Sequence, residues 1–520
     1  MLAQFFFALR GRGIVSAAVL AAGVAAGAVA TLHGQVAGPN VNMVSGKTLP
    51  NGDVFLQRQN EPSGGISTRN PLHLLAGAND YRTVDLPGLP ESQENGDAWL
   101  GVFKSYDGGQ TWKSTLLPGY PQDTSPAGLA SPIKGFQAGA DPTVRSGPNG
   151  MFYYSGIAFN RGTHGLGAVF VSRFIDNNND AAGDPIQYLS TVAVDTGTEA
   201  RFLDKPYLVV DIPRAGALTC TINAPGAGGV QKFAAGAVYL SYTAFTGEGA
   251  TLKSRIMASR SDDCGATWSK PTLVSEQNHL SQGASMAIDP ATGTLFVAWR
   301  QFADATGGNA VLIAKSKDVK PIAKASAAPA PLSFSLPVTL SMINPFDQGS
   351  TPSTFRTNAY PTIAIDGIGR VYVAWSERGW GPYGPNPPSN QDVPPGDARV
   401  VLMTSKDGVR WTDRVEALPP ENITDQDDHG RARYGHFDAK WNPQQPIENT
   451  PGRGHQIMPV LTFLAGKLSV VYYDLREDVS STYESNTDDT SSSTRRRSVT
   501  RSTSAWRRRC PPTRRCSTRR

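Results

Sequence analysis

Cysteine is rare in this chain, with four in 520 residues, which excludes a small fold held together by a dense disulfide framework. Two motifs of nucleotide-binding and esterase folds are also missing: the phosphate-binding P-loop and the Gly-x-Ser-x-Gly elbow. Hydrophobic residues make up 39% of the chain. That fraction is too low for a multi-span membrane protein and high enough for a large core.

Glycine and proline are abundant instead, at 53 and 39 residues, or about 18% of the chain against a usual value of about 12%. Both residues favour turns over long helices. The composition therefore predicts an all-β fold built from many short strands.

The positive charge is concentrated at one end. Lysine and arginine outnumber aspartate and glutamate by 49 to 44, but eleven arginines lie in residues 495–520, so the rest of the chain has a net charge of −6. We therefore expect no nucleic-acid partner.

The tail at 491–520 has no apolar periodicity and is predicted to be disordered. Its composition indicates a frameshifted reading frame, with a basic arm for anionic surfaces as the alternative.

Residues 1–30 have the pattern of a secretory signal. Arg10 and Arg12 precede an apolar run, Ile14 to Ala30, that ends in small residues. An uncleaved membrane anchor is the alternative. With the signal removed, we expect a secreted or cell-envelope protein without a membrane span.

In an oxidising compartment, Cys220 and Cys264 either form a disulfide or remain buried thiols.

A two-part unit recurs six times along the chain. Its first part is an extended segment, a tight turn and a β-rich run, clearest at residues 283–299 and 360–375, and each copy indicates a hairpin. The mean spacing of about 79 residues suits four short strands with long loops. The equivalent positions are Pro62, Pro142, Pro206, Ala284, Pro361 and Pro459.

The second part of the unit is the motif S-x-D-x-G-x-T-W, which occurs twice, with a shortened copy at 405–411. Each copy follows a β-rich run, so we expect it to turn the chain between a third and a fourth strand. Asp and Ser can accept bonds from turn N–H groups, Gly allows a positive φ, and Trp can pack between units. This structural role is predicted for Ser105, Asp107, Gly109, Thr111, Trp112, Ser261, Asp263, Gly265, Thr267 and Trp268.

Through these motifs the sequence resembles the Asp-box (BNR) repeat proteins, and most closely the sialidase-like six-bladed β-propellers. The resemblance covers about residues 51–478 and implies a propeller domain at 31–490, with one blade per unit. Nothing after Glu484 is typical of a third or fourth strand, so the sixth blade is expected to be incomplete. The resemblance also implies exo-acting hydrolysis of terminal sialic acids. The family's Arg-Ile-Pro corresponds here to Asn60-Glu61-Pro62, without the arginine.

Strand direction predicts that first strands start, and second strands end, on the face opposite the S-x-D-x-G-x-T-W turns. Five of the six second strands end near an arginine. We predict substrate binding by Arg82, Arg161, Arg300, Arg378 and Arg476, and catalysis by Asp80, Glu377, Tyr473 and Asp474. The first-strand starts add Glu61, Asp141, Asp204, Lys205 and Tyr360. The alternative is that each arginine pairs with a local carboxylate and ties loops together.

No cofactor is required by this interpretation, but a structural calcium is one hypothesis. Asp176, Asn178 and Asp180 have the spacing of a calcium loop, although Ala181 stands where an EF-hand needs glycine. A solvated turn is the alternative. Residues 425–441 gather two histidines and four aspartates without the spacing of a known metal motif.

The leading hypothesis for function is an exported sialidase-like glycoside hydrolase acting on terminal sialic acid or a related anionic sugar. The alternative is a non-catalytic propeller that binds glycans or envelope proteins. In both cases the expected partner is a glycan or another anionic carbohydrate.

Overall fold

The computed structural model describes residues 40–44, 59–83, 97–162, 166–178, 184–198, 200–224, 229–276, 279–305, 307–317, 329–347, 357–378, 398–416, 456–474 and 503–504. Within these ranges the regular secondary structure is nearly all strand, which confirms the predicted all-β class. The helical elements described are α3 (Pro126–Leu129), η1 (Tyr81–Thr83), η2 (Pro148–Gly150) and η5 (Gly249–Thr251). None of them is long and apolar enough to cross a membrane.

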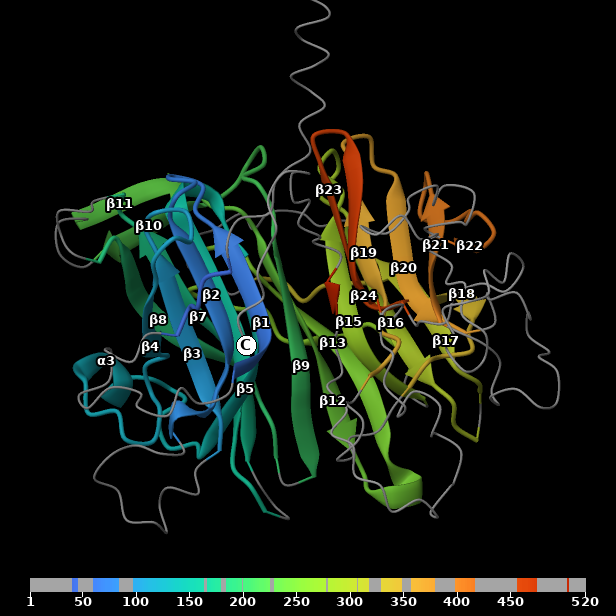
Figure 1. The fold of residues 1–520 in the computed structure, drawn as a ribbon, viewed down its shortest axis with the longest axis horizontal. Coiled ribbons are helices and arrows are strands. Elements are labelled where there is room, and N and C mark those ends of the chain that lie inside the picture. Colours follow the sequence, from blue (N-terminus) through green and yellow to red (C-terminus); the bar gives the residue numbers. More distant parts are fainter. Residues whose placement is uncertain are drawn as a thin grey trace, which may run out of the picture. The chain divides into compact units, whose positions relative to one another are not determined.

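Six sheets follow one another along the chain, and the colours of Figure 1 follow their strands in sequence order from blue to red. The first sheet contains β1 (Gln59–Ile66), β2 (Leu74–Asp80), β3 (Trp99–Ser105) and β4 (Lys113–Leu116). The second contains β5 (Ala138–Ser146), β6 (Met151–Phe159), β7 (Gly167–Asp176) and β8 (Ile186–Thr196). The third contains β9 (Arg201–Val210), β12 (Val238–Thr246), β13 (Lys253–Ser261) and β14 (Thr272–Leu273).

The other three sheets come from the second half of the chain. The fourth contains β15 (Leu280–Ile288), β16 (Leu295–Phe302), β17 (Ala310–Lys315) and β18 (Val338–Met342). The fifth contains β19 (Thr362–Ile365), β20 (Val371–Glu377), β21 (Arg399–Ser405) and β22 (Val415–Glu416). The sixth contains β23 (Gln456–Leu464), β24 (Lys467–Asp474) and the two-residue β25 (Thr503–Ser504). A strand of two residues is too short for apolar alternation to reveal in the sequence.

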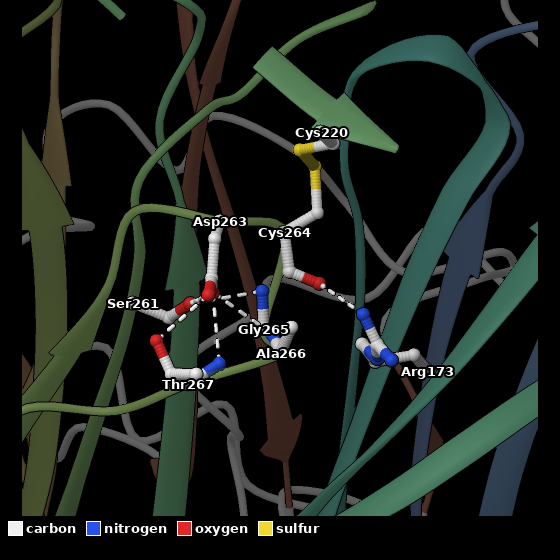
Figure 2. The surroundings of a disulfide bond; sticks show 8 residues. All are labelled: Arg173, Cys220, Ser261, Asp263, Cys264, Gly265, Ala266 and Thr267. Atoms are coloured by element: carbon white, nitrogen blue, oxygen red, sulfur yellow. Dashed lines mark hydrogen bonds between the residues drawn. A yellow bond between two sulfur atoms is a disulfide. The ribbon is translucent and has the colours of Figure 1, made fainter. Parts of the chain in front are cut away.

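A hairpin is inserted into the third sheet between its first two strands. It consists of β10 (Thr219–Ala224) and β11 (Gly229–Ala234), which pair only with each other in the described sheets. A disulfide joins Cys220 of this hairpin to Cys264 in the turn after β13, with Cα atoms 6.0 Å apart (Figure 2). Of the two states that the sequence left open for these cysteines, the structure has the disulfide.

Each sheet packs on the next through a buried apolar cluster. Trp99 lies in the cluster between the first and second sheets, Leu240 between the second and third, and Trp299 between the third and fourth. Trp375 and Leu461 continue the series to the fifth and sixth sheets. Each large apolar side chain buried in this way contributes about 1.5–3 kcal/mol. Among the described residues, no such cluster joins the sixth sheet to the first.

The two complete S-x-D-x-G-x-T-W turns lie between β3 and β4 and between β13 and β14, and they make the same bonds. In the first turn, the Gly109 N–H donates to Ser105 Oγ (2.8 Å), and the Thr111 N–H and hydroxyl donate to the two carboxylate oxygens of Asp107 (2.9 and 2.6 Å). In the second, the corresponding distances are 2.9, 2.8 and 2.7 Å (Figure 2). Trp112 packs on the first sheet, and Trp268 packs on the cluster between the second and third sheets.

Residues Val41–Thr503 form one compact unit, which contains all of the six described sheets apart from Ser504. The predicted signal at 1–30 and nearly all of the predicted tail at 491–520 lie outside the described residues.

Candidate functional site

The strand register defines two opposite edges in each sheet. In the first sheet, Gln59 pairs with Asp80 and Asp80 pairs with Trp99, so the first strand starts where the second ends. Ser105, which begins the S-x-D-x-G-x-T-W turn, pairs with Leu74 at the start of the second strand. We call the edge where first strands start the first edge, and the edge with these turns the second edge.

Five first strands carry the same irregularity near their start. The register breaks at one dipeptide in β1, β5, β9, β15 and β23, and the first residue of that dipeptide has a positive φ. These residues are Glu61 (53°), Asp141 (58°), Lys205 (49°), Gly283 (71°) and Met458 (51°). A left-handed backbone costs a non-glycine residue about 1–3 kcal/mol, and such residues are often found at functional sites. The bulges release the charged side chains from the in-and-out alternation of the strand.

Side chains from these bulges meet at the first edge, although they belong to different sheets. The Asp141 N–H donates to Asn79 Oδ1 (2.8 Å), and the Lys205 N–H donates to Asp141 Oδ2 (3.1 Å). Asn79 Nδ2 donates to Glu61 Oε2 (3.2 Å), and the Lys205 ammonium lies 3.6 Å from Glu61 Oε1. The same ammonium lies 6.0 Å from the centre of the Tyr360 ring. We call these five residues the first-edge cluster.

The cluster combines a carboxyl group of raised pKa with a fixed cation. Burial, followed by a hydrogen bond with the carboxyl group of Asp141, raises the pKa of Glu61 above its ordinary value of 4.5. Burial lowers the pKa of Lys205, but the carboxylates of Asp141 and Glu61 outweigh this effect, so the pKa lies above its ordinary value. The side chains of Glu61 and Lys205 are 36% and 27% exposed. A ligand can therefore reach both groups.

Tyr360 is positioned by neighbours from the fourth sheet and its own segment. Its hydroxyl donates to Gln282 Oε1 (2.8 Å) and accepts from Asn358 Nδ2 (2.9 Å). Gln282 in turn donates to Asp204 Oδ2 (2.6 Å) in the third sheet. This chain of bonds fixes the ring beside Lys205.

The predicted pair Asp80 and Arg82 is bonded internally. The side chains are 0% and 1% exposed, and the Arg82 Nε–H donates to both carboxylate oxygens of Asp80 (2.9 and 2.8 Å). The guanidinium also donates to Ser114 Oγ (3.1 Å) and the Thr115 carbonyl (2.9 Å). All three nitrogens of Arg82 are thus occupied within the first sheet.

Arg300 and Arg161 are also paired with carboxylates. Arg300 is 1% exposed and donates from two nitrogens to Asp347 (2.6 and 2.7 Å), while its plane lies 4.0 Å from the centre of the Phe302 ring. The Arg161 side chain is 68% exposed and pairs with Asp97. These contacts match the alternative in which each arginine ties neighbouring loops together.

Glu377 is buried at the end of β20. It accepts from Trp375 Nε1 (3.0 Å) and pairs with Arg414. Burial raises the pKa of Glu377, and the Arg414 guanidinium opposes that shift. Arg378 lies 5.2 Å from the centre of the Phe346 ring. Both residues are thus held by segments of the fourth and fifth sheets.

The remaining predicted residues of this set are in the sixth sheet. The Tyr473 side chain is 44% exposed on β24. Asp474 pairs through its backbone with Gln456, and Arg476 lies outside the described residues.

Asp176 of the predicted calcium loop is buried and bonded to the first sheet. Its two carboxylate oxygens lie 2.5 Å from Ser67 Oγ and 2.9 Å from His73 Nδ1. Asn178 accepts from Asn70 Nδ2 (3.0 Å), and Asp180 lies outside the described residues, as do residues 425–441. In the part of the chain that is described, no three His, Cys, Asp or Glu residues are grouped to hold a metal. The calcium site stays a prediction.

Asn79 and Gln282 connect the first-edge cluster but were not singled out from the sequence. Both are neutral amides, which carry no charge pattern to mark them. Only their positions could have identified them: Asn79 lies at the end of a second strand, and Gln282 directly precedes a bulge.

The fold was compared with known proteins. No protein-family model and no curated protein sequence matches the chain. It is similar in structure to Trypanosoma rangeli sialidase in complex with the inhibitor DANA, with 14% identity, 82% of this chain and 55% of that chain covered, and a TM-score of 0.36. It is also similar to the intramolecular trans-sialidase from Ruminococcus gnavus in complex with oseltamivir carboxylate (14% identity, 83% and 94% covered, TM-score 0.30). The chain thus spans about half of the Trypanosoma protein. At these TM-scores the similarity assigns no residue role and no activity to this chain.

Proposed function

We propose that this chain is a six-bladed β-propeller of sialidase-like architecture that binds a carbohydrate at the first-edge cluster. The supporting observation is the contact of Lys205, in the third sheet, with Glu61 of the first sheet and Tyr360 of the segment before the fifth. The sheets pack in series, so the first strands of sheets that are not neighbours meet only if the sheets are arranged around an axis. Such an arrangement is that of a propeller with its first strands innermost.

The ligand is proposed to be a neutral, hydroxyl-rich sugar. The cluster offers the carboxyl groups of Glu61 and Asp141, the amide of Asn79, the ammonium of Lys205 and an aromatic ring, which together can donate to and accept from sugar hydroxyls. Two acidic side chains face one cation, so an anionic sugar would meet excess negative charge whenever both are ionised. The described arginines that could have held a sugar carboxylate are mostly paired with protein carboxylates. This favours the binding alternative over sialic acid hydrolysis.

Hydrolysis of a glycosidic bond is the second candidate, and the raised pKa of Glu61 favours it. A carboxyl group with a raised pKa can serve as general acid while a neighbouring carboxylate acts as base. In that mechanism Glu61 protonates the leaving oxygen as the glycosidic bond breaks, and a water molecule adds to the sugar carbon and gives its proton to the carboxylate of Asp141. Activity would then fall as the pH rises through the raised pKa of Glu61, because the acid loses its proton.

Export is part of the proposal. A disulfide such as Cys220–Cys264 persists in oxidising compartments, and the first 30 residues have the pattern of a secretory signal. The protein is therefore proposed to act outside the cytoplasm, secreted or in the cell envelope.

The test is a binding screen on a glycan array, with isothermal titration of the best sugars, alongside fluorogenic glycosides that include a sialoside and a β-galactoside. Glu61→Gln and Lys205→Met should weaken binding about tenfold or more, as expected for lost contacts to charged groups. Glu248→Gln is the matched control, because Glu248 is exposed near the end of β12 on the same edge. Turnover that depends on Glu61 would establish hydrolysis. Absence of both binding and turnover in the folded protein would refute the proposal.

A further inference from the structure

Two aromatic side chains from neighbouring sheets meet at the first edge. Phe159 is the last residue of β6, and Phe202 is the second residue of β9. Their ring centres are 6.0 Å apart, and the rings are nearly perpendicular, at 85°. Phe159 is 8% exposed, whereas Phe202 is 40% exposed. An edge-to-face contact covers at most one face of a ring, so Phe202 presents aromatic surface to solvent at this edge.

The ring of Phe159 is fixed in place by Arg161. The Arg161 guanidinium lies 4.8 Å from the centre of the Phe159 ring and pairs with Asp97. The backbone N–H of Arg161 donates to Gln137 Oε1 (3.0 Å). The ring that contacts Phe202 is therefore ordered before any ligand arrives, and an ordered surface costs less entropy on binding.

A similar arrangement is found between the fourth and fifth sheets. Phe302 is the last residue of β16 and makes an edge-to-face contact with Tyr360 (6.3 Å, 75°). The Arg300 guanidinium lies 4.0 Å from the centre of the Phe302 ring. Since Tyr360 belongs to the first-edge cluster, one aromatic pair of this kind already forms part of the cluster. The pair of Phe159 and Phe202 is its counterpart between the second and third sheets.

Phe202 and the first-edge cluster share a strand. Phe202 lies three residues before Lys205 on β9, nearer to the start of the strand, and three residues of a strand span at most about 10 Å. The Lys205 N–H donates to Asp141 on β5, which pairs with β6. Such a span is longer than one pyranose ring. A sugar bound at the cluster therefore leaves the Phe202 ring free for the next unit of a chain.

We propose that Phe202 forms a second sugar subsite beside the first-edge cluster, and that the ligand is an oligosaccharide of at least two units. One unit lies in the cluster, and the C–H face of the next pyranose ring packs on Phe202. The face of an aromatic ring carries partial negative charge, which attracts the polarised C–H groups of a sugar, and dispersion adds to this attraction. The inference rests on the function proposed for the cluster and adds the length of the ligand to it.

The experiment is isothermal titration of the full chain with matched sugars: glucose and cellobiose, xylose and xylobiose, mannose and mannobiose, and N-acetylglucosamine and chitobiose. In at least one pair, the disaccharide is expected to bind about tenfold more tightly than the monosaccharide, because only its second unit reaches Phe202. Phe202→Leu should reduce the affinity for the disaccharide to that for the monosaccharide, since leucine keeps an apolar side chain without a flat ring. The affinity for the monosaccharide should not change.

Leu252→Ala is the matched control. Leu252 directly precedes β13 at the same edge of the same sheet and is 37% exposed, close to the value for Phe202, so this variant should bind both sugars like the wild type. Phe202→Trp, which has a larger aromatic face, should strengthen binding of the disaccharide alone. Circular dichroism checks the fold of each variant.

Glu61→Gln separates this inference from the function on which it rests, because it should weaken binding of both sugars alike. Two outcomes would overturn the second subsite and leave the cluster in place: a disaccharide that binds no more tightly than its monosaccharide, or a gain that survives in Phe202→Leu. If the folded wild type binds none of these sugars, both proposals are wrong.

Discussion

Buried arginines in this chain keep their charge by pairing with a carboxylate. Arg82 and Arg300 have side chains about 1% exposed, and each donates at least two bonds to an aspartate. Removing one partner of such a pair leaves the other charge buried without compensation. These residues therefore stabilise the sheets. Their contribution to the free energy of unfolding can be compared with that of an exposed ion pair.

Replacing Arg82 with leucine should cost about 3–5 kcal/mol of unfolding free energy, because Asp80 would remain buried and unpaired. The double variant Asp80→Leu/Arg82→Leu should recover part of that loss. Arg161→Leu is the control, since its side chain is 68% exposed and exposed pairs contribute about 0–1 kcal/mol. Urea denaturation measures all three. Equal losses for Arg82→Leu and Arg161→Leu would contradict the structural role.

The turn aspartate Asp107 should give the protein an acid-dependent stability. Its bonds from the Thr111 hydroxyl and N–H lower its pKa from 3.8 to about 2. Because the pKa is lower in the folded state, the stabilisation is present above about pH 4 and is lost as the pH falls toward 2. The difference in urea midpoint between the wild type and Asp107→Asn should therefore shrink over this range. A constant difference from pH 6 to pH 2 would show that ionised Asp107 is not favoured by folding.

At the scale of the element, the β10–β11 hairpin depends on its covalent tie. Two-stranded hairpins are marginally stable alone in water, and in the described sheets this one pairs with no third strand. The Cys220–Cys264 bond closes a loop with a sequence separation of 44. Its main effect is therefore to restrict the unfolded chain and to hold the hairpin base beside the turn after β13.

Cys220→Ser should lower the unfolding free energy by about 4 kcal/mol, the chain-entropy value for a loop of this length. A reducing agent should lower the melting temperature of the wild type to that of the variant and leave the variant unchanged. Differential scanning calorimetry with and without dithiothreitol measures this. A wild type that melts at the same temperature in both conditions would argue against a stabilising disulfide.

At the scale of the whole molecule, protection from solvent is uneven along the series of sheets. Every residue of β6 in the second sheet is buried, because apolar clusters cover both of its faces. The sixth sheet instead exposes Val460 (59%), Leu464 (77%) and Val471 (42%). Regions with few buried contacts open most readily.

Hydrogen exchange should follow this gradient. Amides of β23 (Gln456–Leu464) are expected to exchange faster than those of β6 (Met151–Phe159) by a factor of about ten or more, since local opening of the sixth sheet breaks fewer apolar contacts. Exchange followed by mass spectrometry on the native protein measures both peptides in one sample. Comparable protection would mean that the six sheets open together as one cooperative unit.

The sequence by itself determined the strands and the turns, because both depend on neighbouring residues. Alternating apolar residues give β16 and β20, and the motif at Ser105–Trp112 carries within eight residues the side-chain acceptors, on Ser105 and Asp107, that its turn uses. Pro62 and Pro142, equivalent positions of the repeat, both lie in the bulges of β1 and β5. The all-β class and the second-edge turns follow from these local patterns.

Only the tertiary structure decided which charged residues meet. The sequence made Arg82 as good a candidate for substrate binding as the other arginines. The folded chain instead places its guanidinium within hydrogen-bonding distance of Asp80 and Ser114. Lys205 instead reaches Glu61, from a sheet two positions earlier in the series. A bulge shows where a side chain leaves the alternation of its strand. The residue that this side chain contacts depends on how whole sheets are arranged. No local pattern of residues encodes that arrangement.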